Sequence, residues 1–237
     1  MQNRIFSVDN PKAAKAQAYG YLNGIHYMAP ARLAGVGNLC GNASPGCIEI
    51  CLGQHSGAAV YYPSVIQSRI AKARRFMQQR KVYLRDMWRA IKSAIRQALK
   101  GALKLCIRPN GSTDIAWEAI RDENGATMME SFPSVQFTDY TKSVKRAIAH
   151  AQGKLPSNYH LTFSHSEVNE AQCVQILQAG GNVAVVFAKA FPETWNGYPT
   201  IDGDQHDLRH LDPRGVVVAL SPKGNKAKKD ASGFVVR

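Results

Sequence analysis

Long apolar runs are missing from this sequence, and acidic residues are scarce. No stretch of about 18 apolar residues occurs among the 237 residues, which argues against a membrane-spanning helix. The first twenty residues lack the apolar segment of a secretory signal. We therefore expect a cytoplasmic protein with no membrane partner.

Cysteine is also sparse, with five residues in the chain. An odd count argues against a framework of disulfides, and the reducing cytoplasm keeps thiols free. Three of the five cluster within residues 38–57, whereas Cys106 and Cys173 fall inside a predicted strand and a predicted helix. Clustered thiols in a reducing compartment indicate metal binding or catalysis, and the two isolated ones are expected in the core.

The shortage of acid leaves a net charge of +13, from 30 Lys and Arg against 17 Asp and Glu. Residues 69–104 hold twelve Lys or Arg and a single acid, Asp86. A polyanion, nucleic acid above all, is the expected partner. The plainer interpretation is a solvated basic helix face together with a disordered basic tail.

Strands and helices are predicted to alternate along the chain. Short apolar stretches predict six strands, at 25–28, 103–108, 135–140, 159–164, 182–188 and 215–220. Helical periodicity predicts helices over 69–80, 84–103, 114–129, 142–152 and 169–179. This alternation predicts an α/β fold with a parallel sheet, arranged as a partial (β/α)6 barrel with an extra basic helical segment. The expected organisation is an N-terminal arm (1–20), one domain (21–224) and a basic C-terminal tail (225–237).

Cys40, Cys47 and Cys51 follow the first predicted strand, in a loop rich in Gly, Asn, Ser and Pro. Cys47 and Cys51 are four residues apart and would share one face of a helix. Three thiolates can hold a four-iron, four-sulfur cluster and leave its fourth iron open to a ligand. With His55 they could instead form a closed structural zinc site. The remaining alternative is that they are buried free thiols.

Polar residues follow the other predicted strands, where a barrel of this kind gathers its chemistry. Arg108, Asn110 and Gly111 lie in a turn whose amides could hold an anion, and Ser164 ends a later strand. We predict that these four bind a cofactor. The residues predicted to act in catalysis are Asp114, Lys142, His165 and Asp204. Ordinary capping and loop chemistry is the alternative for each.

Two further patterns are conspicuous. Asp202, Asp204, His206 and Asp207 form the densest acidic stretch and could bind a divalent cation, although a turn-rich loop that pairs with neighbouring arginines is the simpler alternative. The predicted helix 84–103 places its apolar residues on one stripe, namely Trp88, Ile91, Ile95, Leu99 and Leu103. A second face carries the residues predicted to contact nucleic acid, namely Arg89, Lys92, Arg96 and Lys100.

The segments SPGCIEICLG, RPNGSTDIAWE, FTDYTKS, IDGDQHDLRHLDPRG and VVVALSPKG resemble a family of uncharacterised phage proteins over about residues 21–224. The cysteine-rich opening also resembles small radical S-adenosylmethionine enzymes. That resemblance implies a partial (β/α) barrel, a [4Fe-4S] cluster on Cys40, Cys47 and Cys51, and S-adenosylmethionine near the turn at 110–114. The spacing here is C-x6-C-x3-C instead of C-x3-C-x2-C, and Asn110-Gly111-Ser112 replaces the Gly-Gly-Glu turn.

Three functions are consistent with these patterns. The first is an iron–sulfur, radical SAM-like enzyme of a phage or mobile element, acting on a nucleic acid or a nucleotide in the host cytoplasm. The second is a non-enzymatic nucleic-acid-binding protein whose loop is held by structural zinc or a cluster. The third is a metal-dependent hydrolase built on the acidic loop at 202–207.

Overall fold

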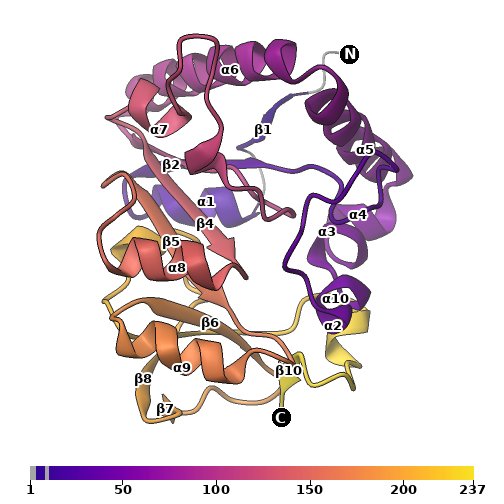
Figure 1. The fold of residues 1–237 in the computed structure, drawn as a ribbon, viewed down its shortest axis with the longest axis vertical. Helices are drawn as coiled ribbons and strands as arrows, with labels where there is room; N and C mark the ends of the chain where they lie inside the picture. Colours follow the sequence, from indigo (N-terminus) through magenta and orange to yellow (C-terminus); the bar gives the residue numbers. More distant parts are fainter. Residues whose placement is uncertain (1–3, 9–10) are drawn as a thin grey trace.

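A computed structural model describes residues 4–8 and 11–237. Its centre is a ten-stranded sheet in which most neighbouring strands run parallel (Figure 1). The strand order is β1-β2-β3-β4-β5-β6-β9-β8-β7, and β10 also pairs with β6. The α/β class and the parallel sheet are therefore confirmed.

Five of the six predicted strands appear within two residues of their expected bounds. The first, predicted at 25–28, is also a strand but begins four residues earlier, at Tyr21. They are β2 (Tyr21–His26), β3 (Lys104–Arg108), β4 (Gln136–Thr141), β5 (Tyr159–Ser164), β6 (Asn182–Phe187) and β9 (Val217–Leu220). These six are mutually parallel and neighbour one another in chain order. Because all six run in the same direction, their carboxyl ends lie along one edge of the sheet. Their order lacks the reversal that defines a doubly wound sheet.

The sheet is open. In the described part of the chain its path ends at β1 (Phe6–Ser7), antiparallel to β2, and at β7 (Thr194–Trp195), antiparallel to β8 (Tyr198–Asp202). The strand β8 lies parallel beside β9. Together β7 and β8 form a hairpin between β6 and β9, where the sequence predicted no strand.

Helices cover both faces of the sheet. One face carries the long helices α5 (Pro63–Gln78) and α6 (Arg80–Lys100), together with α8 (Val144–Ala151) and α9 (Glu170–Gln178). The other face carries α1 (Pro11–Gln17) and the short η2 (Arg209–Leu211). Neighbouring residues of β3 show this division, because Ile107 packs in the core beneath α6 while Cys106 packs against Ala16 and Leu208. The burial of Cys106 and Cys173 agrees with their predicted place in the core.

Three local predictions were wrong. The helix predicted over 114–129 is a loop that contains only η1 (Trp117–Ala119) and α7 (Met128–Ser131). Its Asp122–Ala126 turn is closed by the Asp122 carboxylate and uses Gly125 at a φ of 79°, so the helix cannot continue through it. The stripe predicted on α6 was wrong at Leu99, which is 71% exposed, whereas Ile91 is buried and Trp88, Ile95 and Leu103 pack against the core. The other buried residues of α6 are Tyr83, Leu84, Met87, Ala94 and Ala98.

The third concerns the C-terminal residues, which are folded and do not form a loose tail. They form α10 (Gly224–Lys228) and β10 (Val235–Val236). The strand β10 lies beside β6 and pairs with β6 residues beyond those that pair with β5. The Asp230 carboxylate accepts hydrogen bonds from the backbone amides of Ser232 and Val235. The lysines of this segment predicted a basic tail, but the segment buries Ala227 and Val235 against Ile50 of the cysteine loop.

The described residues include no helix that is long and apolar enough to cross a membrane.

Candidate functional site

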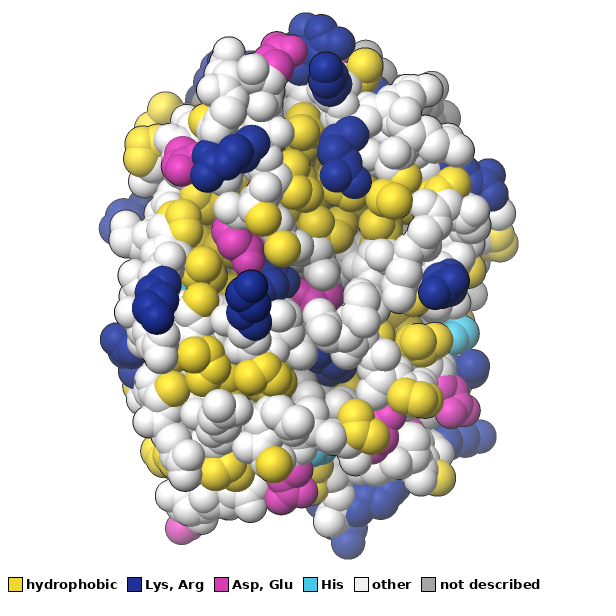
Figure 2. Space-filling model, viewed as in Figure 1, with side chains coloured by type: hydrophobic (Ala, Val, Ile, Leu, Met, Phe, Trp, Pro, Cys, Tyr) yellow, Lys and Arg dark blue, Asp and Glu magenta, His cyan; other side chains and the backbone are white. Residues whose placement is uncertain are grey.

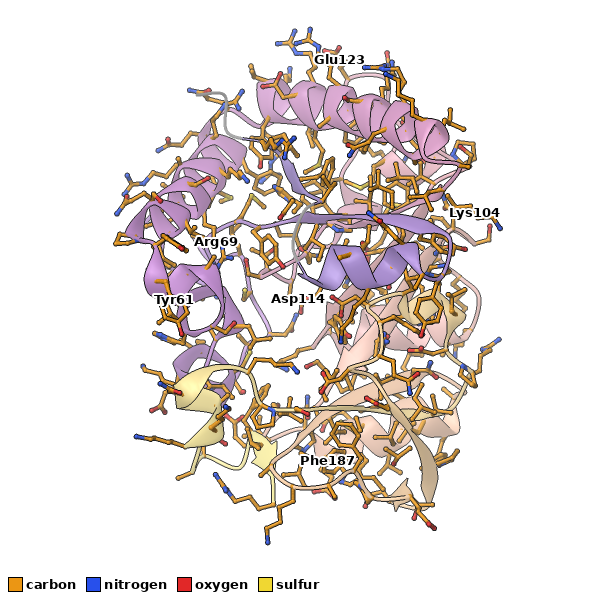
Figure 3. All side chains as sticks on the ribbon, turned by 180° about the vertical axis from the view of Figure 1, so that it is seen from behind. Tyr61, Arg69, Lys104, Asp114, Glu123 and Phe187 are labelled. Atoms are coloured by element: carbon orange, nitrogen blue, oxygen red, sulfur yellow. The ribbon has the colours of Figure 1, made fainter. Side chains whose placement is uncertain are left out.

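A cavity of about 340 Å³ lies at the carboxyl ends of β3, β4, β5, β6 and β9. All three clustered cysteines are on its wall. So are seven other residues predicted for the site, namely Arg108, Asn110, Gly111, Asp114, Lys142, Ser164 and Asp204. Asp114 lies near the centre of the molecule, between the sheet and the helices that carry the cysteines (Figure 3). The fold thus brings together groups that are up to 164 residues apart, Cys40 and Asp204 being the most distant.

The cysteine loop folds as two short helices and not as one. Cys47 lies in α2 (Pro45–Glu49), and Cys51 is the residue before α3 (Leu52–His55). Ser44 caps α2 by accepting a hydrogen bond from the amide of Cys47, at 3.2 Å. The helix breaks at Ile50, so the expected shared helical face of Cys47 and Cys51 does not form, although both thiols still face the cavity.

Close backbone approaches hold this loop against the sheet. A Cβ on Gly53 would lie 2.6 Å from the Cβ of Ser112, and a Cβ on Gly46 would lie 2.8 Å from a Glu167 carboxylate oxygen. Only glycine allows these contacts without a shift of the neighbouring group. Arg69 of α5 donates a hydrogen bond to the carbonyl of Gly53 and so ties α3 to α5. The three thiols are therefore presented on a fixed loop.

Burial disfavours the thiolate form of all three cysteines. Burial raises the pKa of Cys40 to about 12, against a weaker lowering effect from the amide of Ala31 that bonds its sulfur. Burial also raises the pKa of Cys47 and of Cys51. A reactive nucleophilic cysteine needs a lowered pKa, so this environment argues against thiol catalysis. Metal ions deprotonate thiols outright and would overcome the burial.

A single zinc ion does not fit these residues as they stand. Among the described residues, no three His, Cys, Asp or Glu side chains are placed to share one metal ion. His55 is outside the cavity lining and lies beside Lys226 of α10, which together with burial lowers its pKa. In an iron–sulfur cluster each thiolate binds a different iron, so its sulfurs stand farther apart than around one ion. Thiols are the ligand type that such clusters use, and all three line this cavity.

Lys142 lies on the cavity wall opposite the cysteine loop. Its ammonium donates hydrogen bonds to the hydroxyl of Ser164 at 2.8 Å and to the carbonyl of His165 at 3.0 Å. It also lies 4.8 Å from the centre of the Phe234 ring. Burial lowers the pKa of Lys142, and the neighbouring Cys47 and Asp114 raise it again in part. A buried cation so close to the cysteines favours an anionic group in the cavity.

Arg108 provides a second buried cation. Its guanidinium stacks over the Tyr140 ring, 4.5 Å from the ring centre, and forms an ion pair of 3.9 Å with Asp207. The pKa of Arg108 is raised: burial lowers it, but Asp207 and the nearby tyrosines outweigh burial. The planar fork of arginine suits carboxylate or phosphate groups.

Asn110 borders the cavity, yet its side chain is fully used inside the protein. Its amide oxygen accepts hydrogen bonds from Thr113, Ile115 and Trp117, and its NH2 group donates to the carboxylate of Asp139. Asp139 also accepts from the hydroxyl of Tyr159. Burial raises the pKa of Asp139 to about 7, against hydrogen bonds and arginines that lower it. The predicted cofactor-binding Asn110 therefore shapes the turn, and only its neighbours can reach a ligand.

A buried charge cluster beneath the site was missed from the sequence. Arg146 of α8 bonds Asp114 at 2.6 Å and pairs bidentately with Glu118. Both carboxylates are about nine-tenths buried, so this is a charge cluster inside the protein. Asp114 also accepts from the backbone amide of Lys142, which fixes the ends of β3 and β4 together. With both oxygens committed in this way, Asp114 is a positioning residue in this arrangement.

The acidic loop is divided between roles. Asp202 is exposed, and Asp204 accepts hydrogen bonds from Lys223 and from the amide of Ser221, which lower its pKa against the raising effect of burial. The carbonyl of Asp204 accepts from Lys15 of α1. His206 bonds Arg209. Asp212 pairs with Arg209 at 3.3 Å, as the simpler alternative expected, whereas Asp204 pairs with a lysine. Among the described residues, no three His, Cys, Asp or Glu side chains are placed to bind the metal ion of a hydrolase.

His165 and the basic face of α6 lie away from the cavity. His165, which was predicted to act in catalysis, is buried, is not part of the cavity lining, and packs its ring edge-on against Trp195, 5.5 Å between ring centres. Arg89, Lys92, Arg96 and Lys100 are all exposed on α6. Lys and Arg side chains are spread widely over one face of the molecule, and acidic side chains are few there (Figure 2).

Comparison with known proteins identifies the family. A family model described as gene product 88 matches residues 4–237. The chain belongs to the gene product 88 family. The expected likeness to a phage protein family is thereby confirmed, whereas its radical SAM component is not shown by this match. No curated protein and no solved structure matches the chain significantly.

Proposed function

We propose that this member of the gene product 88 family is an iron–sulfur enzyme that acts on a nucleotide or nucleic acid in the host cytoplasm. The observation that carries the proposal is that Cys40, Cys47 and Cys51 all line one cavity, at the carboxyl ends of parallel strands. In this class of fold that edge is where reactions take place. A three-thiolate cluster supplies an electron and one iron that is open to a ligand.

The cavity supports an anionic ligand. Arg108 and Lys142 project from the ends of β3 and β4, and Lys15 and Lys223 stand at the rim. The carboxylates on the wall are paired with cations, namely Asp114 with Arg146, Asp204 with Lys223 and Asp207 with Arg108. An anionic ligand would therefore share Arg108 with Asp207. Arg108 would bind phosphate or carboxylate oxygens, and Lys142 would supply a point charge close to the thiols.

S-adenosylmethionine is the cofactor that the radical SAM resemblance assigns to the turn at 110–112. The side chain of Asn110 is spent on protein atoms, so it cannot take the place of the usual Gly-Gly-Glu carboxylate. In this proposal the cofactor is held by Arg108 and by the backbone around Gly111. Gly111 is required there, because a Cβ would lie 2.7 Å from the carbonyl oxygen of His26.

A second candidate is a nucleic-acid-binding protein without catalysis, in which the thiols only hold the loop. The exposed basic face of α6 favours it, because charge of this density binds phosphates whatever the cavity contains. The metal content of protein prepared without oxygen separates the two. Brown protein with iron and absorbance at about 400 nm supports the enzyme. Colourless protein with stoichiometric zinc refutes it and leaves the binding protein.

A further inference from the structure

Five helices form a continuous outer ridge beside the cavity. The helix α10 contacts α3, α3 contacts α4 (Ala58–Tyr61), α4 contacts α5, and α5 contacts α6. In Figure 1 α5, α4, α3 and α10 follow one another down one side of the molecule, with α6 across its top. The junction of α10 and α3 is tight, since Gly224 packs directly on the carbonyl of His55.

Cations occupy both ends of this ridge. Lys226, Lys228 and Lys229 are exposed at the α10 end, and α5 and α6 expose Arg74 and the basic face already described. The helical residues 45–100 contain two acids, Glu49 and Asp86. Asp86 is already paired with Arg75 and Arg89. The field along the ridge is therefore positive and suits a partner with repeated negative charge.

The middle of the ridge exposes apolar and aromatic side chains. Tyr61 is 77% exposed, Tyr62 is 61% exposed and Val60 is 56% exposed. Tyr61 projects from the edge of the molecule in Figure 3. Leu52, which is 47% exposed, continues this patch to the cavity that it also lines. The two tyrosines lie at the N-terminal end of α5, and α6 begins near the C-terminal end of α5, about 24 Å away.

We infer that the ridge binds single-stranded nucleic acid, with bases stacked on Tyr61 and Tyr62 and phosphates on the flanking cations. Aromatic rings between cationic groups are how proteins hold single strands, because an unpaired base offers a free face and a base inside a duplex does not. Leu52 then leads one nucleotide of the strand into the cysteine cavity. This last step rests on the proposed function, but binding on the ridge does not.

Fluorescence anisotropy with a labelled oligothymidine of about 20 nucleotides tests the inference. Replacing both rings, Tyr61→Ala with Tyr62→Ala, should weaken binding about tenfold or more, and Tyr61→Phe with Tyr62→Phe should retain it. Val168→Ala, an equally exposed apolar residue off the ridge, is the matched control and should change nothing. A duplex of the same length should bind all variants alike, through phosphates alone.

Three results would overturn the inference. One is unchanged single-strand affinity in the alanine variant, and another is an equal loss with the duplex. The third is that vesicles of phosphatidylserine and phosphatidylcholine bind the wild type but not the alanine variant, which would assign the patch to a membrane surface. Iron is measured on the same samples. Tyrosine-dependent binding by protein without iron refutes the proposed enzyme alone, whereas tyrosine-independent binding by iron-loaded protein refutes the ridge alone.

Discussion

The carboxylate of Glu167 accepts a hydrogen bond of 2.8 Å from the backbone amide of Gly46, 121 residues earlier in the chain. Its other oxygen accepts from the hydroxyl of Ser44, also at 2.8 Å. One side chain that follows β5 thus satisfies the start of α2, the helix that carries Cys47. The cysteine loop is held by the sheet edge that it faces.

Replacing Glu167 by Ala should loosen this loop. Two hydrogen bonds to a charged acceptor are lost, which lowers the free energy of unfolding by ~1–3 kcal/mol. Urea unfolding measures this loss, and the iron retained after anaerobic desalting should fall with it. Glu123→Ala removes an exposed carboxylate elsewhere and should leave both values unchanged. Full iron retention in the Glu167 variant would mean that the loop does not depend on this contact.

Asn110 should matter for folding more than for ligand binding. Asn110→Ala leaves the buried indole NH of Trp117 without its acceptor and removes one of the donors to the Asp139 carboxylate, so we expect a loss of about 3 kcal/mol in unfolding free energy. Chemical denaturation gives the value. Asn124→Ala, at an exposed turn, should cost at most about 0.5 kcal/mol. Similar costs for the two variants would contradict the role assigned to Asn110.

The exposed face of α6 should control the salt dependence of nucleic-acid binding. We expect its four cations, changed together to Gln, to lower both the affinity and the slope of log K against log salt by up to about 3 for a single strand. These cations are Arg89, Lys92, Arg96 and Lys100. The control neutralises three exposed lysines on other elements, namely Lys145, Lys154 and Lys189, and the two variants are compared per charge removed. An equal drop in slope per charge would show that charge acts without regard to place.

Histidines at the amino ends of the strands should make the protein sensitive to acid. Burial, with nearby arginines and histidines, lowers the pKa of His150 to about 4, of His160 to about 3 and of His210 to about 4. The unfolded chain takes up these protons near pH 6.5 and the folded chain does not, so their stability contribution is full above pH 6.5 and is lost as pH falls through about 4. Asp139 and Asp212, whose pKa values are raised by burial, oppose this trend.

A comparison of variants isolates the histidine effect. His210→Phe keeps the ring that packs on Tyr21, 5.0 Å between centres, and removes the proton site. Its unfolding free energy, measured between pH 7 and pH 5, should fall less steeply than that of the wild type, by up to about 1.4 kcal/mol per pH unit. Identical slopes for the two proteins would show that His210 does not titrate differently in the folded state.

The sequence predicted the sheet because its signals are local. The continuous apolar run in β6 and the Gly180-Gly181 stop after α9 are each sufficient to place their elements. Common strand direction then placed Arg108, Lys142 and Ser164 at one edge of the sheet. The sequence could not predict features that depend on contacts between distant parts of the chain. Arg146 and Glu118 look like surface charges until α8 lies over η1, and the C-terminal segment looks like a tail until Val235 pairs with β6.

The same limit applies to the cysteines. Their spacing indicated a shared site, and the structure does place all three on one cavity. The spacing could not show that α2 ends at Ile50, nor that Gly46 and Gly53 lie close against residues far away in the sequence. His55 seemed a fourth ligand because of its spacing, yet α10 packs beside it and its ring lies outside the cavity.

We propose above that Cys40, Cys47 and Cys51 hold three irons of a four-iron cluster and leave the fourth open to a ligand. A Mössbauer spectrum of protein reconstituted with iron-57 tests it most directly. We expect a cluster in which one iron in about four gives a distinct signal, and this signal should shift when S-adenosylmethionine or a nucleotide is added. Changing the three cysteines to Ser should abolish the spectrum, and changing Cys106 and Cys173 to Ser should preserve it. A spectrum that survives loss of the three cysteines, or folded protein that takes up no cluster, would contradict the account.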